Sequence, residues 1–223
     1  MEKVIKLEGI NKKFGDKEIY KGLNLEVEKG QTVGFVGENG CGKSVLFQII
    51  SGLTKVDCGK VSVNGKALGE KNDFADNVGI LINEPGYIEY ISGYENLKLL
   101  AEIKNIIGKK EIIEAMMKVG LDPKDKTPVK KYSMGMKQKL GIAQAIMEGQ
   151  EVVILDEPYN ALDFKTNKDV TEVLKELKTE GKTVLLSSHQ HEYLEKLCDV
   201  IYCVYDKKVI LFDEEMKKKY FSE

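Results

Sequence analysis

A phosphate-binding pattern constrains this chain more than any other feature of its sequence. Residues 37–44 are GENGCGKS, which fits G-x-x-x-x-G-K-[ST] at every position. The apolar run 32–36 predicts a strand before the pattern, and residues 44–50 predict the buried opening of a helix that runs from Lys43 to about Leu53. Glycines let consecutive N–H groups face one anion, and a helix N-terminus adds partial positive charge. We therefore expect a nucleotide site in which Lys43 neutralises the β- and γ-phosphates and Ser44 holds Mg²⁺.

Length and charge narrow the class of protein. A chain of 223 residues can bury the core of one α/β domain with a subdomain inserted into it. A formal net charge of −2 argues against a nucleic-acid partner held by a strongly basic face. No apolar run approaches the length that spans a bilayer, so we expect any membrane role to come through a partner.

The cysteines and the basic residues exclude two kinds of site. The four cysteines form no Cys-x-x-Cys pair and have no metal-type spacing with the two histidines, which predicts reduced thiols in a cytosolic protein without a structural metal. All 34 basic residues are lysines. The chain therefore contains no arginine finger to place on a phosphate.

The order of expected elements is that of an α/β fold with a β-rich opening. Residues 4–14 and 19–27 predict strands around a turn at residues 15–17, and later strands are expected at 58–63, 78–82, 152–156 and 183–188. Residues 84–150 are mainly helical in pattern and predict a subdomain inserted between strands. Four apolar residues on its approach loop are either core or a docking patch: Tyr87, Ile88, Tyr90 and Ile91.

Polar groups follow two of the buried strands. Asp156 and Glu157 end the apolar run 152–155, and His189 follows the run 183–188. Carboxylates at the mouth of a buried parallel strand are costly unless they serve a cation or a proton transfer. We expect Asp156 to bind Mg²⁺ and Glu157 to activate water. A lone histidine at a strand end is usually structural, but its place beside these groups favours a role in the site.

A further helix begins in the segment 132–138. Ser133 stands where an N-cap is expected, before a helix that carries Leu140, Ala143 and Met147 on one side. On this local pattern alone, the segment predicts a capped helix and nothing more.

Taken together, these segments resemble the ATP-binding subunit of an ABC transporter from about residue 3 to residue 213. Residues 37–44 resemble Walker A, 132–136 the signature, 152–156 Walker B, and 161–163 the D-loop. The resemblance implies a P-loop NTPase core with a mainly parallel sheet, an N-terminal antiparallel β subdomain and a helical subdomain. It also implies a single domain over 1–223, with the core in 1–83 and 151–223 and the helical signature subdomain in 84–150.

The resemblance assigns roles to individual residues. Glu157 is the implied catalytic base, His189 the switch histidine and Lys43 a further catalytic group. The implied Mg²⁺ ligands are Ser44, Asp156 and Asn83. The residues implied to bind ATP are Phe14, Gly37, Asn39, Gly40, Cys41, Gly42, Lys43, Ser44, Val45, Ser133, Gly135 and Asp163. Phe14 matches the aromatic that stacks on adenine, whereas strand periodicity alone fits a half-buried residue equally well.

The chain departs from the family pattern at three places. Asn83 stands where the Q-loop glutamine is usual, and the adjacent Glu84 is a candidate to share its role. Val45 replaces the usual threonine after Ser44. The signature keeps Ser133 and Gly135 but has Tyr132, Met134 and Met136 at its other positions. This form is similar to that of the ATPases of bacterial drug and antimicrobial-peptide exporters. The stretch 82–87 is similar to the same ATPases.

The resemblance implies partners and a location. ATP is expected between the Walker A loop of one subunit and the signature of a second ATPase subunit, either another copy or a different chain. The expected function is to power a separate transmembrane permease, an exporter of drugs or antimicrobial peptides, from the cytoplasmic face of a bacterial membrane. The alternative is a soluble ABC-type ATPase of an assembly process, such as iron–sulfur cluster assembly.

Overall fold

The computed structural model describes residues 2–69, 73–83, 86–160, 162–189 and 191–221. Glu84 and the D-loop residue Ala161 lie outside the described residues. The strands are β1 (Lys3–Phe14), β2 (Lys17–Glu28), β3 (Thr32–Val36), β4 (Cys58–Val63), β5 (Lys66–Ala67), β6 (Val78–Leu81), β7 (Val152–Leu155), β8 (Thr183–Ser187), β9 (Val200–Tyr205) and β10 (Lys208–Leu211). The helices are α1 (Lys43–Ser51), α2 (Gly93–Lys104), α3 (Lys109–Lys118), the 3₁₀ turn η1 (Val129–Lys131), α4 (Met134–Ile146), α5 (Phe164–Thr179), α6 (His191–Leu197) and α7 (Glu214–Phe221).

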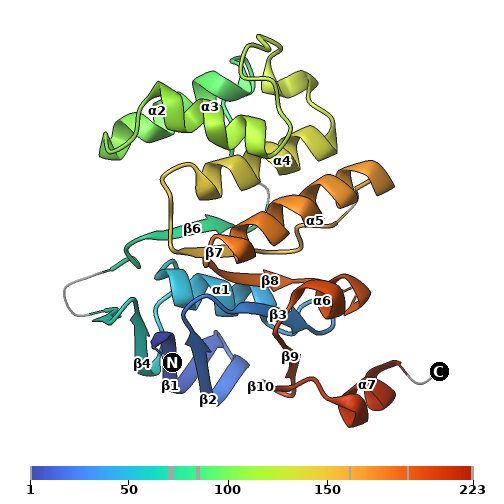
Figure 1. The fold of residues 1–223 in the computed structure, drawn as a ribbon. Helices are drawn as coiled ribbons and strands as arrows, with labels where there is room; N and C mark the ends of the chain where they lie inside the picture. Colours follow the sequence, from blue (N-terminus) through green and yellow to red (C-terminus); the bar gives the residue numbers. More distant parts are fainter. Residues whose placement is uncertain (1, 70–72, 84–85, 161, 190, 222–223) are drawn as a thin grey trace.

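Two sheets organise the molecule (Figure 1). The larger has the order β10-β9-β3-β8-β7-β6, and its strands are parallel except β10, which pairs antiparallel with β9. The smaller is antiparallel, with the order β2-β1-β4-β5. This arrangement confirms the predicted fold class.

Helix α1 lies between the two sheets. Its buried residues Leu46, Phe47 and Ile50 share one apolar cluster with residues of β1, β2 and β4 and with one face of β3, β7 and β8. Helices α4, α5 and α6 cover the opposite face of the parallel sheet (Figure 1). Strands β3, β7 and β8 are therefore buried along their whole length, as expected of parallel strands covered on both faces.

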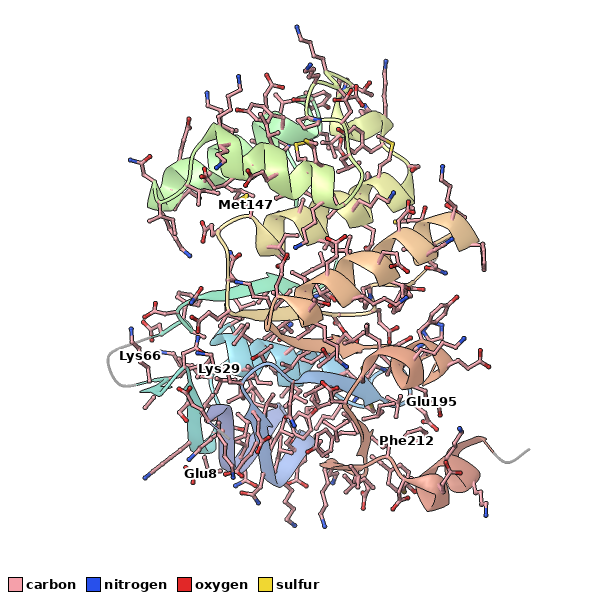
Figure 2. All side chains as sticks on the ribbon, viewed as in Figure 1. Glu8, Lys29, Lys66, Met147, Glu195 and Phe212 are labelled. Atoms are coloured by element: carbon pink, nitrogen blue, oxygen red, sulfur yellow. The ribbon has the colours of Figure 1, made fainter. Side chains whose placement is uncertain are left out.

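Helices α2, α3 and α4 form the block at the top of Figure 1. Their apolar residues belong to the same buried cluster as one face of β7 and β8, and Figure 2 labels Met147 at this junction. Helix α4 crosses β6 so closely that a Cβ on Gly79 would lie 1.7 Å from the carbonyl oxygen of Ala145. The boundaries 84 and 150 of the helical subdomain stay a prediction.

Some elements differ from the sequence-based expectation. Helix α1 ends at Ser51, two residues before the expected Leu53, because Gly52 adopts a left-handed conformation with φ of 86°. The hairpin of β9 and β10 and the helix α7 were not predicted. Among the described residues, none of the helices combines the length and the apolar character that a membrane crossing requires.

Candidate active site

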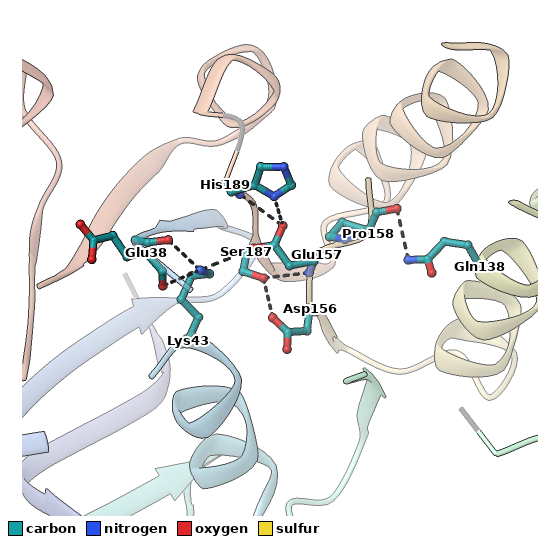
Figure 3. Close-up of polar contacts among 9 residues, drawn as sticks. Glu38, Lys43, Gln138, Asp156, Glu157, Pro158, Ser187 and His189 are labelled. Atoms are coloured by element: carbon teal, nitrogen blue, oxygen red, sulfur yellow. Dashed lines mark hydrogen bonds and ion pairs between the residues drawn. The ribbon is translucent and has the colours of Figure 1, made fainter. Parts of the chain in front are cut away.

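The carboxyl ends of three parallel strands gather the predicted site residues. Strands β3 and β7 both pair with β8, so the loops that follow them meet at one edge of the sheet. Figure 3 shows Lys43, Asp156, Glu157 and His189 at this edge. We call it the catalytic edge, and we call residues 37–44 the phosphate loop.

The phosphate loop depends on its glycines. Gly37, Gly40 and Gly42 have φ of 155°, 77° and 121°, values that disfavour residues with a side chain. A Cβ on Gly37 would lie 2.7 Å from Cys41 Sγ, and one on Gly42 would lie 2.9 Å from the hydroxyl oxygen of Tyr20. Backbone conformation and space therefore both require glycine at residues 37 and 42.

Tyr20 of β2 holds the end of this loop. Its hydroxyl donates a 2.8 Å hydrogen bond to the carbonyl oxygen of Gly42, and the side chain is fully buried. Burial raises the pKa of Tyr20 well above its usual value, so the hydroxyl keeps its proton and remains a donor. The antiparallel sheet thus positions the first turn of α1.

Lys43 is buried at the start of α1, with 6 % of its surface exposed. Its Nζ donates to the carbonyl oxygens of Gly37 at 2.7 Å and Glu38 at 3.3 Å, and lies 3.5 Å from Glu157 Oε1. The ammonium is thereby held inside the phosphate loop and beside the predicted catalytic carboxylate.

The Glu157 carboxylate contacts both Lys43 and His189. Its Oε2 lies 3.0 Å from His189 Nδ1 and accepts a hydrogen bond of 3.2 Å from the His189 backbone N–H. Its backbone has φ of 48°, which is uncommon for a residue with a long side chain. The other carboxylate oxygen is buried and has no hydrogen bond within the part of the chain that the structure describes.

Ser187 lies between the two acids. Its hydroxyl donates a 2.6 Å hydrogen bond to Asp156 Oδ1 and accepts a 2.8 Å hydrogen bond from the backbone N–H of Glu157. Ser187 is fully buried at the end of β8, so it fixes the two acids relative to that strand.

The residues at this edge suit a hard cation. Asp156 is only 9 % exposed, and none of the described lysines or histidines forms an ion pair with it. A buried carboxylate without a cationic partner is costly, and carboxylate and hydroxyl oxygens are the donors that Mg²⁺ prefers. Ser44 and Asp156 fit such an ion. Asn83 follows β6 at the same edge but is exposed, and no hydrogen bond among the described residues joins it to the acids.

The remaining predicted nucleotide contacts differ in exposure. Asn39 and Gly40 are exposed, Val45 is half-buried against the core, and Phe14 is 48 % exposed at the end of β1 beside Lys12. Cys41 is half-buried, and burial raises the pKa of its thiol, so the thiol stays protonated at neutral pH.

The signature residues lie apart from the phosphate loop. Ser133 caps α4 by accepting a hydrogen bond from the Met136 N–H, and Gly135 packs against Thr166 at the start of α5. Asp163 caps α5 by accepting hydrogen bonds from the backbone N–H and the hydroxyl of Thr166. These two hydrogen bonds lower the pKa of the Asp163 carboxyl. Within the described residues, no hydrogen bond or ion pair joins Ser133, Gly135 or Asp163 to residues 37–44.

Comparison with known proteins identifies the family. The sequence profile of the ABC transporter family matches residues 20–160, well over half of the chain. The chain belongs to the ABC transporter family. The predicted resemblance is thereby confirmed, and the chain is an ATP-binding and ATP-hydrolysing subunit of this family.

Three known proteins are similar to this ABC subunit. The lantibiotic transport ATP-binding protein SrtF of Streptococcus pyogenes is 33% identical over 95% of this chain and 91% of its own length. The bacitracin transport ATP-binding protein BcrA of Enterococcus faecalis is 36% identical over 90% of this chain, which spans 66% of BcrA. A dimeric ATP-binding cassette in a post-hydrolysis state, bound to ADP and Pi, has a TM-score of 0.81 at 25% identity, over 92% of this chain and 96% of that one. None of these names supports the alternative of a soluble assembly ATPase.

Sequence reasoning missed Tyr20 and Ser187. Both contact the site through tertiary packing, Tyr20 from β2 and Ser187 from the neighbouring parallel strand. The only available signal for Ser187 was a hydroxyl at the end of a mostly apolar strand, two residues before His189. For Tyr20 the sequence offered no signal beyond strand periodicity.

Proposed function

We propose that Glu157 and His189 form the catalytic pair of this ATPase. The observation that carries the proposal is the Glu157 carboxylate, which lies 3.0 Å from His189 Nδ1 and 3.5 Å from Lys43 Nζ. Glu157 accepts a proton from the attacking water or orients it. Lys43 and His189 stabilise the negative charge that develops on the transferred phosphoryl group, a task for which this chain has no arginine.

We further propose that the residues predicted from the sequence to bind ATP and Mg²⁺ do so. The backbone of residues 37–44 binds the phosphates, Phe14 stacks on the base, and Ser44 and Asp156, assisted by Asn83, hold Mg²⁺. When bound, Mg²⁺ neutralises charge on the β- and γ-phosphates. Lys43 and the N-terminus of α1 provide the chain's own positive charge at the same place.

The second half of each site comes from another ATPase subunit. Ser133 and Met134 are exposed at the N-terminus of α4, whose free N–H groups and helix dipole suit a γ-phosphate. We place this terminus against the phosphate loop of a second subunit in a head-to-tail dimer, either another copy or a different chain. The solved cassette of similar fold is dimeric, which supports this arrangement.

The approach loop of the helical block is proposed to contact the permease. Of its four apolar residues, Tyr87 packs against the core, whereas Ile88 and Tyr90 are 51% and 76% exposed. Lys130 lies over the Tyr90 ring at 5.4 Å, and a hollow of about 190 Å³ beside the loop is lined by Tyr87, Val129 and Gln138. Apolar groups beside a hollow suit an inserted segment of another protein.

The cargo is proposed from the relatives. SrtF and BcrA are named for transport of a lantibiotic and of bacitracin, which are antimicrobial peptides. We propose that this subunit powers an exporter of such peptides or of drugs, and that it does so at the cytoplasmic face of the bacterial membrane.

Substitution of Glu157 by glutamine tests the catalytic assignment. The change keeps size and removes the base, so we expect ATP turnover to fall by about 10²- to 10⁴-fold while ATP binding persists. Steady-state phosphate release and titration with a fluorescent ATP analogue measure the two quantities. Glu151→Gln is the matched control, because Glu151 is exposed at the opposite end of β7. Turnover within twofold of wild type would remove Glu157 from the role of base.

A further inference from the structure

Two tyrosines from the segments that follow Glu157 and His189 stack on each other. The rings of Tyr159 and Tyr193 have centroids 4.6 Å apart and an interplanar angle of 18°. Tyr159 is 4% exposed and belongs to the segment after β7, whereas Tyr193 lies on α6. The stack therefore joins the segment that carries Glu157 to the helix that follows His189.

Helix α5 holds the polar end of both rings. The Tyr159 hydroxyl lies 3.3 Å from Thr171 Oγ1, which itself donates to the carbonyl oxygen of Asn167 at 2.8 Å. The Tyr193 hydroxyl lies 3.4 Å from Asn167 Nδ2. Burial raises the pKa of Tyr159 to about 12, so its hydroxyl keeps its proton and can donate to Thr171. Both hydroxyl contacts are long for hydrogen bonds, so the ring stack carries most of the interaction.

The catalytic pair is unequally buried. The Glu157 side chain is 21% exposed and the His189 side chain is 49% exposed, so burial does not fix the imidazole. Glu157 also has φ of 48°, and a conformation of this kind persists only where the surrounding structure holds it. Tyr159 comes two residues after Glu157, and Tyr193 comes four residues after His189. Each member of the pair thus has a stacked tyrosine close behind it in the chain.

We propose that the Tyr159–Tyr193 stack positions the catalytic pair, and that Tyr193 is a positioning residue for ATP hydrolysis. The stack keeps the start of α6 against the Walker B segment, which keeps His189 within hydrogen-bond distance of Glu157. Because α5 contacts both rings and is capped by Asp163, the same unit also connects this D-loop residue to the pair. This inference rests on the proposed roles of Glu157 and His189.

Two substitutions at Tyr193 test the inference. Tyr193→Leu removes the ring, and because small misplacements of catalytic groups are costly, we expect kcat to fall by about 10- to 100-fold with an ATP KM within about twofold of wild type. Tyr193→Phe keeps the stack and loses only a long hydrogen bond, so we expect it to retain kcat within about threefold. Tyr94→Leu, a half-buried tyrosine on α2, is the matched control for loss of an aromatic ring.

The outcomes separate this inference from the proposed function. A Tyr193→Leu protein that is folded at the assay temperature and keeps wild-type kcat overturns the positioning role, whatever Glu157→Gln does. Equal losses in Tyr193→Leu and Tyr94→Leu also overturn it, because the effect is then one of general packing. If Glu157→Gln stays active while Tyr193→Leu loses kcat, the role of Glu157 as base fails. A crystal structure of Tyr193→Leu gives a readout independent of turnover, in which we expect the contact between Glu157 and His189 to be broken. An intact contact overturns the inference.

Discussion

Two helix N-termini in this molecule differ in how far the chain itself completes them. Helix α1 begins within the phosphate loop, and its first residue, Lys43, is buried among carbonyl oxygens and the Glu157 carboxylate. Helix α4 begins within the signature, and its first residue, Met134, is 47% exposed. We call the phosphate loop the inward half, and Ser133 and Gly135 the outward half, of the proposed site. The chain itself buries Lys43 of the inward half, whereas Ser133 of the outward half is exposed, as the proposed dimer requires.

The outward half is nevertheless held firmly from behind. A Cβ on Gly135 would lie 3.0 Å from Thr166 Oγ1 and 3.1 Å from its Cγ2. Thr166 is itself fixed by Asp163, whose carboxylate accepts hydrogen bonds from its backbone N–H and its hydroxyl. Gly135 of the signature and Asp163 of the D-loop therefore both contact Thr166.

Gly135→Ala disrupts the outward half of the site, and of the substitutions in this comparison it has the largest expected effect on kcat. The added methyl group pushes the signature backbone away from Thr166 and toward the proposed partner, so we expect kcat to fall by about 100-fold. ATP binding to the dilute single subunit is expected to stay at the wild-type level, because the phosphate loop is untouched. Phosphate release and titration with a fluorescent ATP analogue check both statements.

A second substitution tests whether the close approach of the added methyl group to Thr166 causes the loss of activity. Thr166→Ala in the Gly135→Ala background removes both close atoms, so we expect recovery of about tenfold of the lost activity. Turnover near the wild-type rate in Gly135→Ala alone contradicts the placement of this glycine in the site.

Tyr20→Phe tests the inward half of the site, and we expect it to change stability and ATP affinity only modestly. It removes a buried hydrogen bond, but the Gly42 carbonyl keeps the bond from the Leu46 N–H at 2.9 Å. We expect the free energy of unfolding to fall by about 1 kcal/mol in a urea titration, with ATP affinity about threefold weaker. Tyr90→Phe is the control, since an exposed tyrosine should change stability by less than about 0.5 kcal/mol. Equal stability of Tyr20→Phe and wild type would show that the sheet does not hold the loop.

The sequence predicts the inward half of the site better than the outward half. The phosphate loop is one contiguous pattern between a strand and a helix, and Asp156, Glu157 and His189 each end a buried strand. Because parallel strands bring their carboxyl ends to one edge, the sequence predicts that these groups lie together, and the structure places them so. The fold class followed from the same strands.

The remaining contacts depend on packing that no local pattern records. Tyr193 meets Tyr159 only because α6 packs beside the segment after β7, and Ser187 contacts both acids only because β8 pairs with β7. The exposure of Ile88 and Tyr90 could not be predicted either, since an apolar loop has no periodicity that separates core from surface.

Mixing two defective variants tests the shared site most directly. Lys43→Ala damages the inward half of every site and Gly135→Ala the outward half, so neither protein alone has an intact site. In a heterodimer, one site combines the intact phosphate loop of one chain with the intact signature of the other. We expect an equimolar mixture to recover about a quarter of the wild-type ATPase activity, since half of the dimers are mixed and each has one intact site. A mixture no more active than the two variants measured separately would contradict an active site shared between two copies of this chain.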